Sequence, residues 1–293
     1  MSPRALIRTL RPQQWVKNVF VAAALVFAQR LTHVPSLVRT AAAVLAFCLL
    51  SGAVYCFNDV RDVEADRQHP TKKYRPIAAG ALSERAALIW AGTLALIALG
   101  GCLALSPRLA VIAAAYLVQN VFYSIKLKQV AFVDVALIAS GFILRVLAGA
   151  AAIDVPASRW LLLCTGLLAL FFGFGKRAHE LSWAERSGKA THNTRAALAG
   201  YRIPVVRVLM GVLAILTCAS YVAYTIAPRT TYAFGTDKLV YSAPFVAIGV
   251  LRFMFLALWY PKDEPPTEAM LKDPYFLADL VLAAATVLYI IYR

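Results

Sequence analysis

Nine apolar segments, each close to twenty residues long, constrain this chain more than any other feature. They lie at about 14–31, 36–57, 83–105, 107–125, 130–152, 159–178, 203–227, 239–260 and 275–293. Hydrophobic residues make up 61% of the chain and charged residues only 15%, whereas soluble domains carry about 25% charged residues. An apolar helix of about 20 residues is long enough to cross a bilayer. The sequence therefore predicts an all-α, polytopic membrane protein with about nine transmembrane helices, forming one domain over residues 1–293.

The net charge of +15 at pH 7 raises the question of a nucleic-acid partner, but its distribution points to a membrane instead. With nine spans, the N-terminus and the loops after the second, fourth, sixth and eighth helices share one side. Most of the 30 lysines and arginines fall on that side, which the positive-inside rule places in the cytoplasm. We therefore expect a protein of the inner (plasma) membrane. No nucleic acid is needed to explain the charge, because anionic lipid headgroups also attract it.

An acidic motif directly follows the second apolar segment and reads Asn58-Asp59-Val60-Arg61-Asp62-Val63-Glu64-Ala65-Asp66. On a helix, positions i, i+4 and i+8 share one face, which places Asn58, Asp62 and Asp66 in one column. Such oxygen ligands suit a hard cation that keeps some waters and bridges to phosphate oxygens. The alternative is a solvated helix end with a charged loop. Three oxygen ligands in phase favour the metal site.

Basic residues come immediately after this motif, in the run His69-Pro70-Thr71-Lys72-Lys73-Tyr74-Arg75-Pro76. They supply the positive charge that a phosphate held by the metal would meet. Two loops on the cytoplasmic side, at about 58–82 and 179–202, are long enough to form ordered caps over a cavity.

Charged side chains within apolar segments are costly, by about 2.5–3.5 kcal/mol at a helix centre, and so mark candidate functional positions. Arg145 lies in the middle of its segment and needs an anionic partner, either a carboxylate such as Asp134 or a phosphate. A fixed ion pair between helices is the structural alternative. Lys176 and Arg177 end the sixth segment, where cations are also ordinary partners of the helix dipole. Further candidates are Lys17, Tyr123, Lys128 and Glu180, whereas Arg252 and Asp279 could simply pair with each other or snorkel.

The motif Asn58-Asp59-x-x-Asp62-x-x-x-Asp66 resembles the first aspartate-rich motif of the UbiA superfamily of intramembrane prenyltransferases. The resemblance covers nearly the whole chain, including Arg11–Asn18 and Tyr123-Ser124 with Leu127-Lys128. Within the superfamily, the chain is similar to the polyprenyl-phosphate phosphoribosyltransferase branch. That similarity rests on Asn58 to Lys72, on Arg75-Pro76-Ile77-Ala78-Ala79-Gly80, and on Lys176-Arg177 with Glu180.

One departure from the superfamily concerns a second aspartate-rich motif, of the DxxxD type, which aromatic prenyltransferases carry after the fourth helix. Here the region reads Tyr123-Ser124-Ile125-Lys126-Leu127-Lys128, with only Asp134 further on. A second carboxylate cage for another metal is therefore doubtful, and prenyl-diphosphate chemistry with it.

The resemblance implies nine helices around a cavity that opens to the cytoplasm and sideways to lipid. It implies transfer of 5-phosphoribose from 5-phosphoribosyl-1-diphosphate to a long-chain polyprenyl phosphate. The products would be diphosphate and polyprenyl-phosphoryl-5-phosphoribose, a precursor of lipid-linked pentose donors such as decaprenylphosphoryl-arabinose for cell-envelope glycan. Mg²⁺ held by Asn58, Asp62 and Asp66 would neutralise the leaving diphosphate. Asp59, Asp62 and Asp66 are the expected catalytic carboxylates, with Asp59 beside the metal ligands or on a ribose hydroxyl.

Three phosphate-bearing groups would then meet in one pocket, which explains a need for many cations. The expected substrate-binding residues are Lys17, Lys72, Lys73, Arg75, Tyr123, Lys128, Asp134, Arg145, Lys176, Arg177 and Glu180. Two alternatives stay open. One is a prenyl-diphosphate transferase with an aromatic or quinone acceptor. The other is a transporter of lipid phosphates or small anions, although the repeated broken helices of transporters are not found. The polyprenyl chain length and assembly into a homo-oligomer are left open by the sequence.

Overall fold

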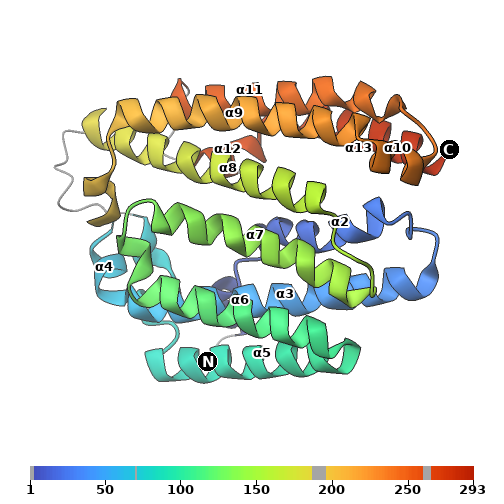
Figure 1. Cartoon of the computed structure of the whole chain (residues 1–293). Helices are drawn as coiled ribbons and strands as arrows, with labels where there is room; N and C mark the ends of the chain where they lie inside the picture. Colours follow the sequence, from blue (N-terminus) through green and yellow to red (C-terminus); the bar gives the residue numbers. More distant parts are fainter. Residues whose placement is uncertain (1–2, 70, 187–195, 260–264) are drawn as a thin grey trace. The chain divides into compact units, whose positions relative to one another are not determined.

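The computed structural model describes residues 3–69, 71–186, 196–259 and 265–293, and no residue in these ranges lies in a β-strand (Figure 1). The elements are α1 (Pro3–Thr9), η1 (Pro12–Asn18), α2 (Val19–Phe27), α3 (Val34–Arg61), α4 (Val63–Gln68), η2 (Lys72–Tyr74), α5 (Glu84–Leu105), α6 (Pro107–Ile125), η3 (Leu127–Gln129), α7 (Val133–Ala152), α8 (Arg159–Arg186), η5 (Ala196–Gly200), α9 (Ile203–Ile226), α10 (Pro228–Phe234), η6 (Lys238–Ser242), α11 (Ala243–Leu258), α12 (Pro266–Met270) and α13 (Pro274–Tyr292). The η elements are 3₁₀-helices.

Eight helices in the described part of the chain are long and apolar enough to cross a membrane. They are α3, α5, α6, α7, α8, α9, η6 with α11, and α13. The all-α, polytopic prediction is thereby confirmed, whereas nine spanning helices are not found among these residues. The segment expected at 14–31 is divided between η1 and α2, and α2 has nine residues. At 1.5 Å per residue, α2 reaches about 13.5 Å, less than half of a hydrocarbon core of about 30 Å.

Both predicted cap loops contain more helix than the sequence suggested. In the first, α3 continues to Arg61 and is followed by α4 and η2. In the second, α8 continues to Arg186, so the predicted loop 179–202 begins as helix. Residues 187–195 of that loop, and residue 70 of the first, lie outside the described residues.

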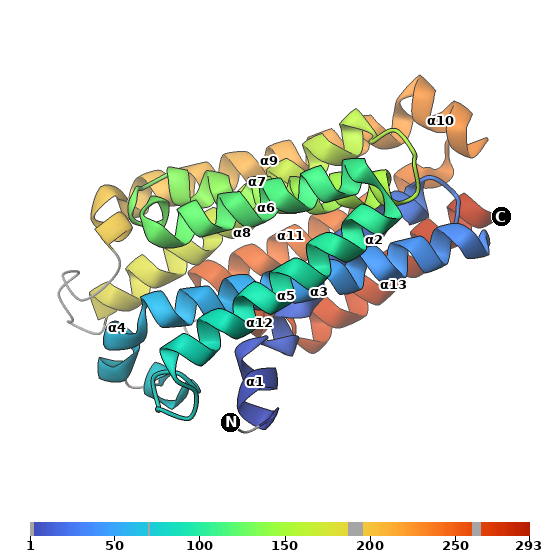
Figure 2. The same ribbon diagram turned by 90° about the horizontal axis from the view of Figure 1, so that it is seen from below.

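The chain divides into two compact units. Unit 1 comprises Met1–Leu127 and Gly141–Ala157, and in it α3 packs against α2, α5 and α6 (Figures 1 and 2). Phe47 and Leu50 of α3 are fully buried in the apolar core of this unit. Arg39, near the start of α3, donates hydrogen bonds to the carbonyls of Leu105 (2.7 Å) and Ala152 (2.6 Å). It thereby satisfies carbonyls that the ends of α5 and α7 leave open.

Unit 2 comprises Lys128–Ser140 and Ser158–Arg293, so the first part of α7 belongs to it. Within this unit α8 packs against α9 and α11, and α11 packs against α13. The core is aromatic in character, with Phe171 of α8 edge-on to Phe253 of α11 at 5.2 Å between ring centroids. This framework holds the helices that carry Asp134 and Arg177.

Gly149 of α7 permits a close approach between the backbones of α7 and α2. A Cβ atom at this position would lie 1.8 Å from the carbonyl oxygen of Val21 in α2. A backbone carbonyl cannot rotate away as a side chain can, so the two elements would have to move apart.

We therefore expect Gly149→Ala to lower the melting temperature of the detergent-solubilised protein, since overpacking typically costs about 1–3 kcal/mol. Gly100→Ala on α5 is the matched control, because no atom lies within 4 Å of a Cβ built there. In a helix this control should be neutral or stabilising by up to ~1 kcal/mol. Equal melting temperatures for the two variants would contradict the close approach.

Candidate functional site

The acidic motif forms a buried ion cluster at the end of α3. Asp59 lies in the last turn of α3 and Asp66 in α4, and both are 3% exposed. One guanidinium nitrogen of Arg75, Nη1, contacts Asp66 Oδ2 at 2.5 Å and Asp59 Oδ1 at 3.1 Å. Arg11 donates a further hydrogen bond of 2.5 Å to Asp59 Oδ1. Arg75 therefore bridges the two carboxylates, and Arg11 adds a second positive charge beside Asp59.

Helical hydrogen bonds of the backbone connect the three predicted ligands, although the helix is interrupted once between them. The amide of Asp62 donates to the carbonyl of Asn58 (2.9 Å), and that of Asp66 donates to the carbonyl of Asp62 (2.8 Å). The break is at Asp62, where the backbone (φ −101°, ψ 8°) separates α3 from α4. Asn58 and Asp62 are half-buried, whereas Glu64 is exposed and pairs with Arg67 at 2.6 Å. Glu64 thus points away from the cluster, as its spacing predicts.

A divalent cation fits the chemistry of this cluster. Two carboxylate oxygens converge on one positive centre, the Nη1 atom of Arg75, and Mg²⁺ prefers such hard oxygen donors. Across the described residues, no group of three His, Cys, Asp or Glu side chains is already arranged for a metal ion. Asn58, Asp62 and Asp66 therefore stay predicted ligands. Asp59 contributes a further carboxylate, which pairs with the same arginine, Arg75, as Asp66 does.

Arg145 is buried (6% exposed) in α7, and within the described ranges it donates hydrogen bonds to neutral acceptors alone. Its Nε atom donates to Asn18 Oδ1 (2.8 Å), Nη1 to the carbonyl of Gly141 (3.0 Å) and Nη2 to the hydroxyl of Tyr116 (2.8 Å). The guanidinium also lies over the ring of Tyr116, 4.8 Å from its centroid. No described carboxylate pairs with it. A buried charge without an opposite charge is costly, so this position favours an anionic ligand.

Asp134 pairs with Arg177, and the suggested Asp134–Arg145 pair is therefore wrong. Both residues are fully buried, with 3.0 Å between Arg177 Nε and Asp134 Oδ2. Arg177 Nη1 also pairs with Glu180. The charge of Arg177 is thus balanced from two sides, although its Nε and Nη2 atoms and Asp134 Oδ2 make no hydrogen bond within the described residues. Arg177 differs from Arg145 in being already neutralised by protein.

Tyr201, just before α9, completes this second network and is absent from the residues that the sequence singled out. Its hydroxyl donates to Asp134 Oδ1 (2.5 Å) and accepts from the amide of Phe132 (2.6 Å). Burial, and then the hydrogen bond to Asp134, raise the pKa of Tyr201. The hydroxyl therefore stays protonated and able to donate. A single tyrosine in a polar loop gives no sequence signal of this role.

The other predicted binding residues lie on several different elements. Lys72 and Lys73 are exposed on η2, and the ammonium of Lys73 lies 5.2 Å from the ring centroid of Tyr74. Half-buried positions are occupied by Lys17, Tyr123, Lys128, Lys176 and Glu180. Their roles toward substrates stay predictions.

Arg252 pairs with Asp273, so the suggested Arg252–Asp279 pair is wrong. The contacts are bidentate, at 3.0 Å and 2.6 Å. The hydrogen bonds from Arg252 lower the pKa of Asp273, which also caps α13 by accepting from the amide of Phe276 (2.8 Å). The ion pair therefore holds Asp273 at the position where it caps the N-terminus of α13.

We expect Tyr201→Phe to lower the melting temperature, because it leaves the amide of Phe132 without its acceptor and Asp134 without a donor. An unsatisfied buried polar group costs about 1–3 kcal/mol. Tyr232→Phe is the control, since Tyr232 is 92% exposed. If the Tyr201→Phe protein were as stable as the control, the hydrogen bonds of Tyr201 to Asp134 and Phe132 would not stabilise the fold.

Comparison with known proteins assigns the whole chain to a family. Residues 18–278 match the UbiA prenyltransferase family. Decaprenyl-phosphate phosphoribosyltransferase of Mycobacterium tuberculosis is 36% identical over 283 residues, covering 94% of this chain and 89% of that protein. The enzyme of the same name from Corynebacterium glutamicum is 33% identical over 291 residues, covering 94% and 82%.

Solved structures agree on the fold. A UbiA homolog from Archaeoglobus fulgidus, bound to DMAPP and Mg²⁺, matches with a TM-score of 0.71 at 16% identity, covering 98% of this chain and 99% of that one. An apo UbiA homolog from Aeropyrum pernix matches with a TM-score of 0.63 at 15% identity, covering 99% and 98%. At these identities the likeness concerns the arrangement of helices.

Proposed function

Because the chain belongs to the UbiA prenyltransferase family, we propose that it works in the membrane as a polyprenyl-phosphate phosphoribosyltransferase. It moves 5-phosphoribose from 5-phosphoribosyl-1-diphosphate to a long-chain polyprenyl phosphate. The relatives named decaprenyl-phosphate phosphoribosyltransferase, which align over most of the chain, support this reaction. The family match runs across both compact units, from which we infer one functional domain. Because this is a family of transferases, membership in it also favours an enzyme over a transporter.

The observation that carries the proposal is the buried guanidinium of Arg145, which has only neutral partners among the described residues. A prenyl diphosphate brings one anionic group, which a metal and one or two cations can hold. The phosphoribosyl donor adds a 5-phosphate and the lipid acceptor adds its own phosphate. A cation outside the acidic cluster, with no carboxylate of its own, suits one of these additional phosphates.

In the proposed mechanism, Asn58, Asp62 and Asp66 would hold Mg²⁺, which when bound would supply positive charge to the leaving diphosphate. Arg75 and Arg11 hold the Asp59 carboxylate in place. The bond between ribose C1 and the diphosphate oxygen breaks, and a bond from C1 to the lipid phosphate oxygen forms. The ribose passes through an oxocarbenium-like state, which nearby carboxylates stabilise.

No general base is needed, because the lipid phosphate is already an anion at neutral pH. Catalysis then rests on positioning and electrostatics. The acidic motif faces the cytoplasm in this proposal, since the sugar donor is soluble there and the basic loops favour that side.

The test is a reconstitution with purified protein, labelled phosphoribosyl diphosphate, Mg²⁺ and a polyprenyl phosphate, with label in the lipid phase as readout. We expect Asp62→Ala and Asp66→Ala to abolish transfer, because each removes a proposed metal ligand. Glu64→Ala is the control within the same motif, since Glu64 is exposed and pairs only with Arg67 among the described residues. Equal damage from Glu64→Ala would overturn the ligand assignment. Turnover of a prenyl diphosphate with an aromatic acceptor, and none of phosphoribosyl diphosphate, would overturn the reaction.

Arg145→Ala should weaken phosphoribosyl transfer roughly 10- to 100-fold, because a hydrogen bond to a charged group is worth about 1.5–3 kcal/mol. Arg252→Ala, which breaks an ion pair elsewhere, should weaken it much less. Melting temperatures of both variants distinguish lost binding from lost structure. Unchanged transfer by a folded Arg145→Ala protein would remove the observation on which the proposal rests.

A further inference from the structure

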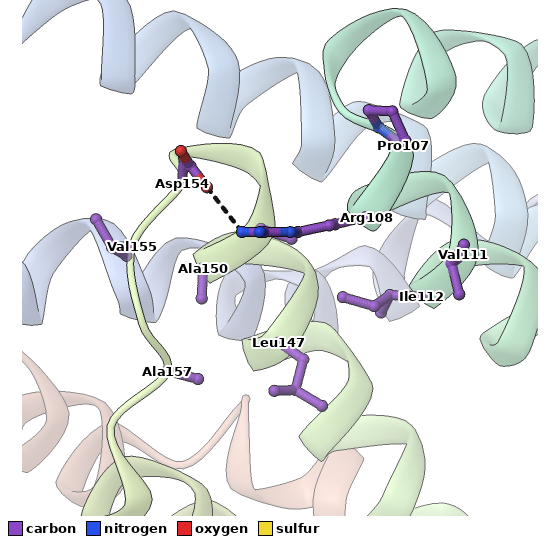
Figure 3. Close-up of a pocket in the computed structure, with 10 residues that line it drawn as sticks. Pro107, Arg108, Val111, Ile112, Leu147, Ala150, Asp154, Val155 and Ala157 are labelled. Carbon is purple, nitrogen blue, oxygen red and sulfur yellow. Dashed lines mark hydrogen bonds and ion pairs between the residues drawn. The ribbon is translucent and has the colours of Figure 1, made fainter.

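A groove in unit 1 lies at the opposite end of α3 from the acidic motif. Arg39, near the start of α3, bonds to the last carbonyls of α5 and α7, and the groove of about 530 Å³ lies beside these helix ends (Figure 3). Asp59, in contrast, is in the last turn of α3. The groove is therefore separate from the acidic motif, and Arg145 is not among its lining residues.

The wall of the groove is apolar and its rim carries one charge of each sign. Val111 and Ile112 of α6, with Leu147 and Ala150 of α7, contribute to the wall. The charged lining residues are Arg108 and Asp154, which form an ion pair of 3.1 Å across the rim (Figure 3). Their side chains are 81% and 80% exposed. An ion pair so exposed stabilises a protein little, so a ligand can open it at small cost.

The turn that contains Asp154 does not need a carboxylate side chain at this position. The amide of Val155 donates to the carbonyl of Ala150 (3.0 Å), the long bond of a Schellman turn that ends α7. Asp154 occupies the left-handed position of this turn, with φ 52°. Glycine is the usual residue there because it has no Cβ. Here the position carries an acid that faces Arg108.

We propose that this groove binds a zwitterionic phospholipid of the phosphatidylethanolamine type. An acyl chain lies along the apolar wall, the phosphate pairs with Arg108, and the ammonium group pairs with Asp154. The headgroup then replaces one exposed ion pair by two charge-assisted hydrogen bonds. A lipid with only a phosphate, such as phosphatidylglycerol or a polyprenyl phosphate, would leave Asp154 facing an anion. A choline headgroup has no N–H to donate.

The experiment uses the full-length protein in nanodiscs that contain equal amounts of phosphatidylethanolamine, phosphatidylglycerol and phosphatidylcholine with identical acyl chains. A trace of polyprenyl phosphate is included as a competitor. Native mass spectrometry then identifies the lipids that the protein retains after release. We expect retention of phosphatidylethanolamine over the other lipids by roughly 5- to 10-fold, a modest factor because the rim is exposed.

Two variants separate the two charges. Arg108→Ala should abolish selective retention of any phospholipid. Asp154→Gly keeps the turn, since glycine suits a positive φ, and should remove the preference for phosphatidylethanolamine while raising retention of phosphatidylglycerol. Ala157→Trp, in the irregular segment that lines the groove, should block retention sterically.

Arg229→Ala is the control, because it removes an exposed arginine from α10 in the other unit. Melting temperatures without added lipid establish that each variant is folded. Equal retention of all lipids, retention of polyprenyl phosphate alone, or a preference for phosphatidylethanolamine that survives Asp154→Gly would each overturn the proposal.

Discussion

A charge that is buried in a membrane protein must find a partner, and the protein solves this problem in two different ways. Arg177 is balanced by Asp134 and Glu180, with Tyr201 holding Asp134 from the other side. Such a network is costly to break, because loss of one member leaves an unpaired charge in a dry environment. Arg145 receives three neutral acceptors instead. Arg177 is thus neutralised by two carboxylates, whereas the charge of Arg145 meets only neutral groups among the described residues.

The acidic cluster is intermediate, because its charges are paired but its arginines are only partly buried. Asp59 and Asp66 are balanced by Arg75 and Arg11, but Arg75 follows a short 3₁₀-helix and is only half-buried. An arginine that holds two carboxylates together can exchange them for phosphate oxygens when a cation takes over the carboxylates. The cluster therefore combines the donors for a metal with a guanidinium suited to the diphosphate that the metal would accompany.

The sequence predicted the long helices well, because hydropathy over twenty residues depends little on tertiary context. It failed at 14–31, where Gln14 and Asn18 interrupt the apolar pattern and the first residues belong to a 3₁₀-helix that begins at Pro12. The acidic motif was visible because its residues are neighbours in the chain. The pairing of Asp134 with Arg177 and Tyr201 was not, since these residues are far apart in sequence and only packing brings them together. For the same reason the choice of partner for Arg145 had to await the structure.

The hydrogen bonds of Arg39 can form only in a fixed order while unit 1 is being synthesised. Its two carbonyl acceptors, at Leu105 and Ala152, follow it by 66 and 113 residues. While the chain is still growing on the ribosome, α3 exists before either acceptor has been made, and water or lipid headgroups must solvate the guanidinium. Completion of α5 supplies the first acceptor and completion of α7 the second. The segment that contains Asp59 is thus secured at its far end only after half of the polypeptide has been translated.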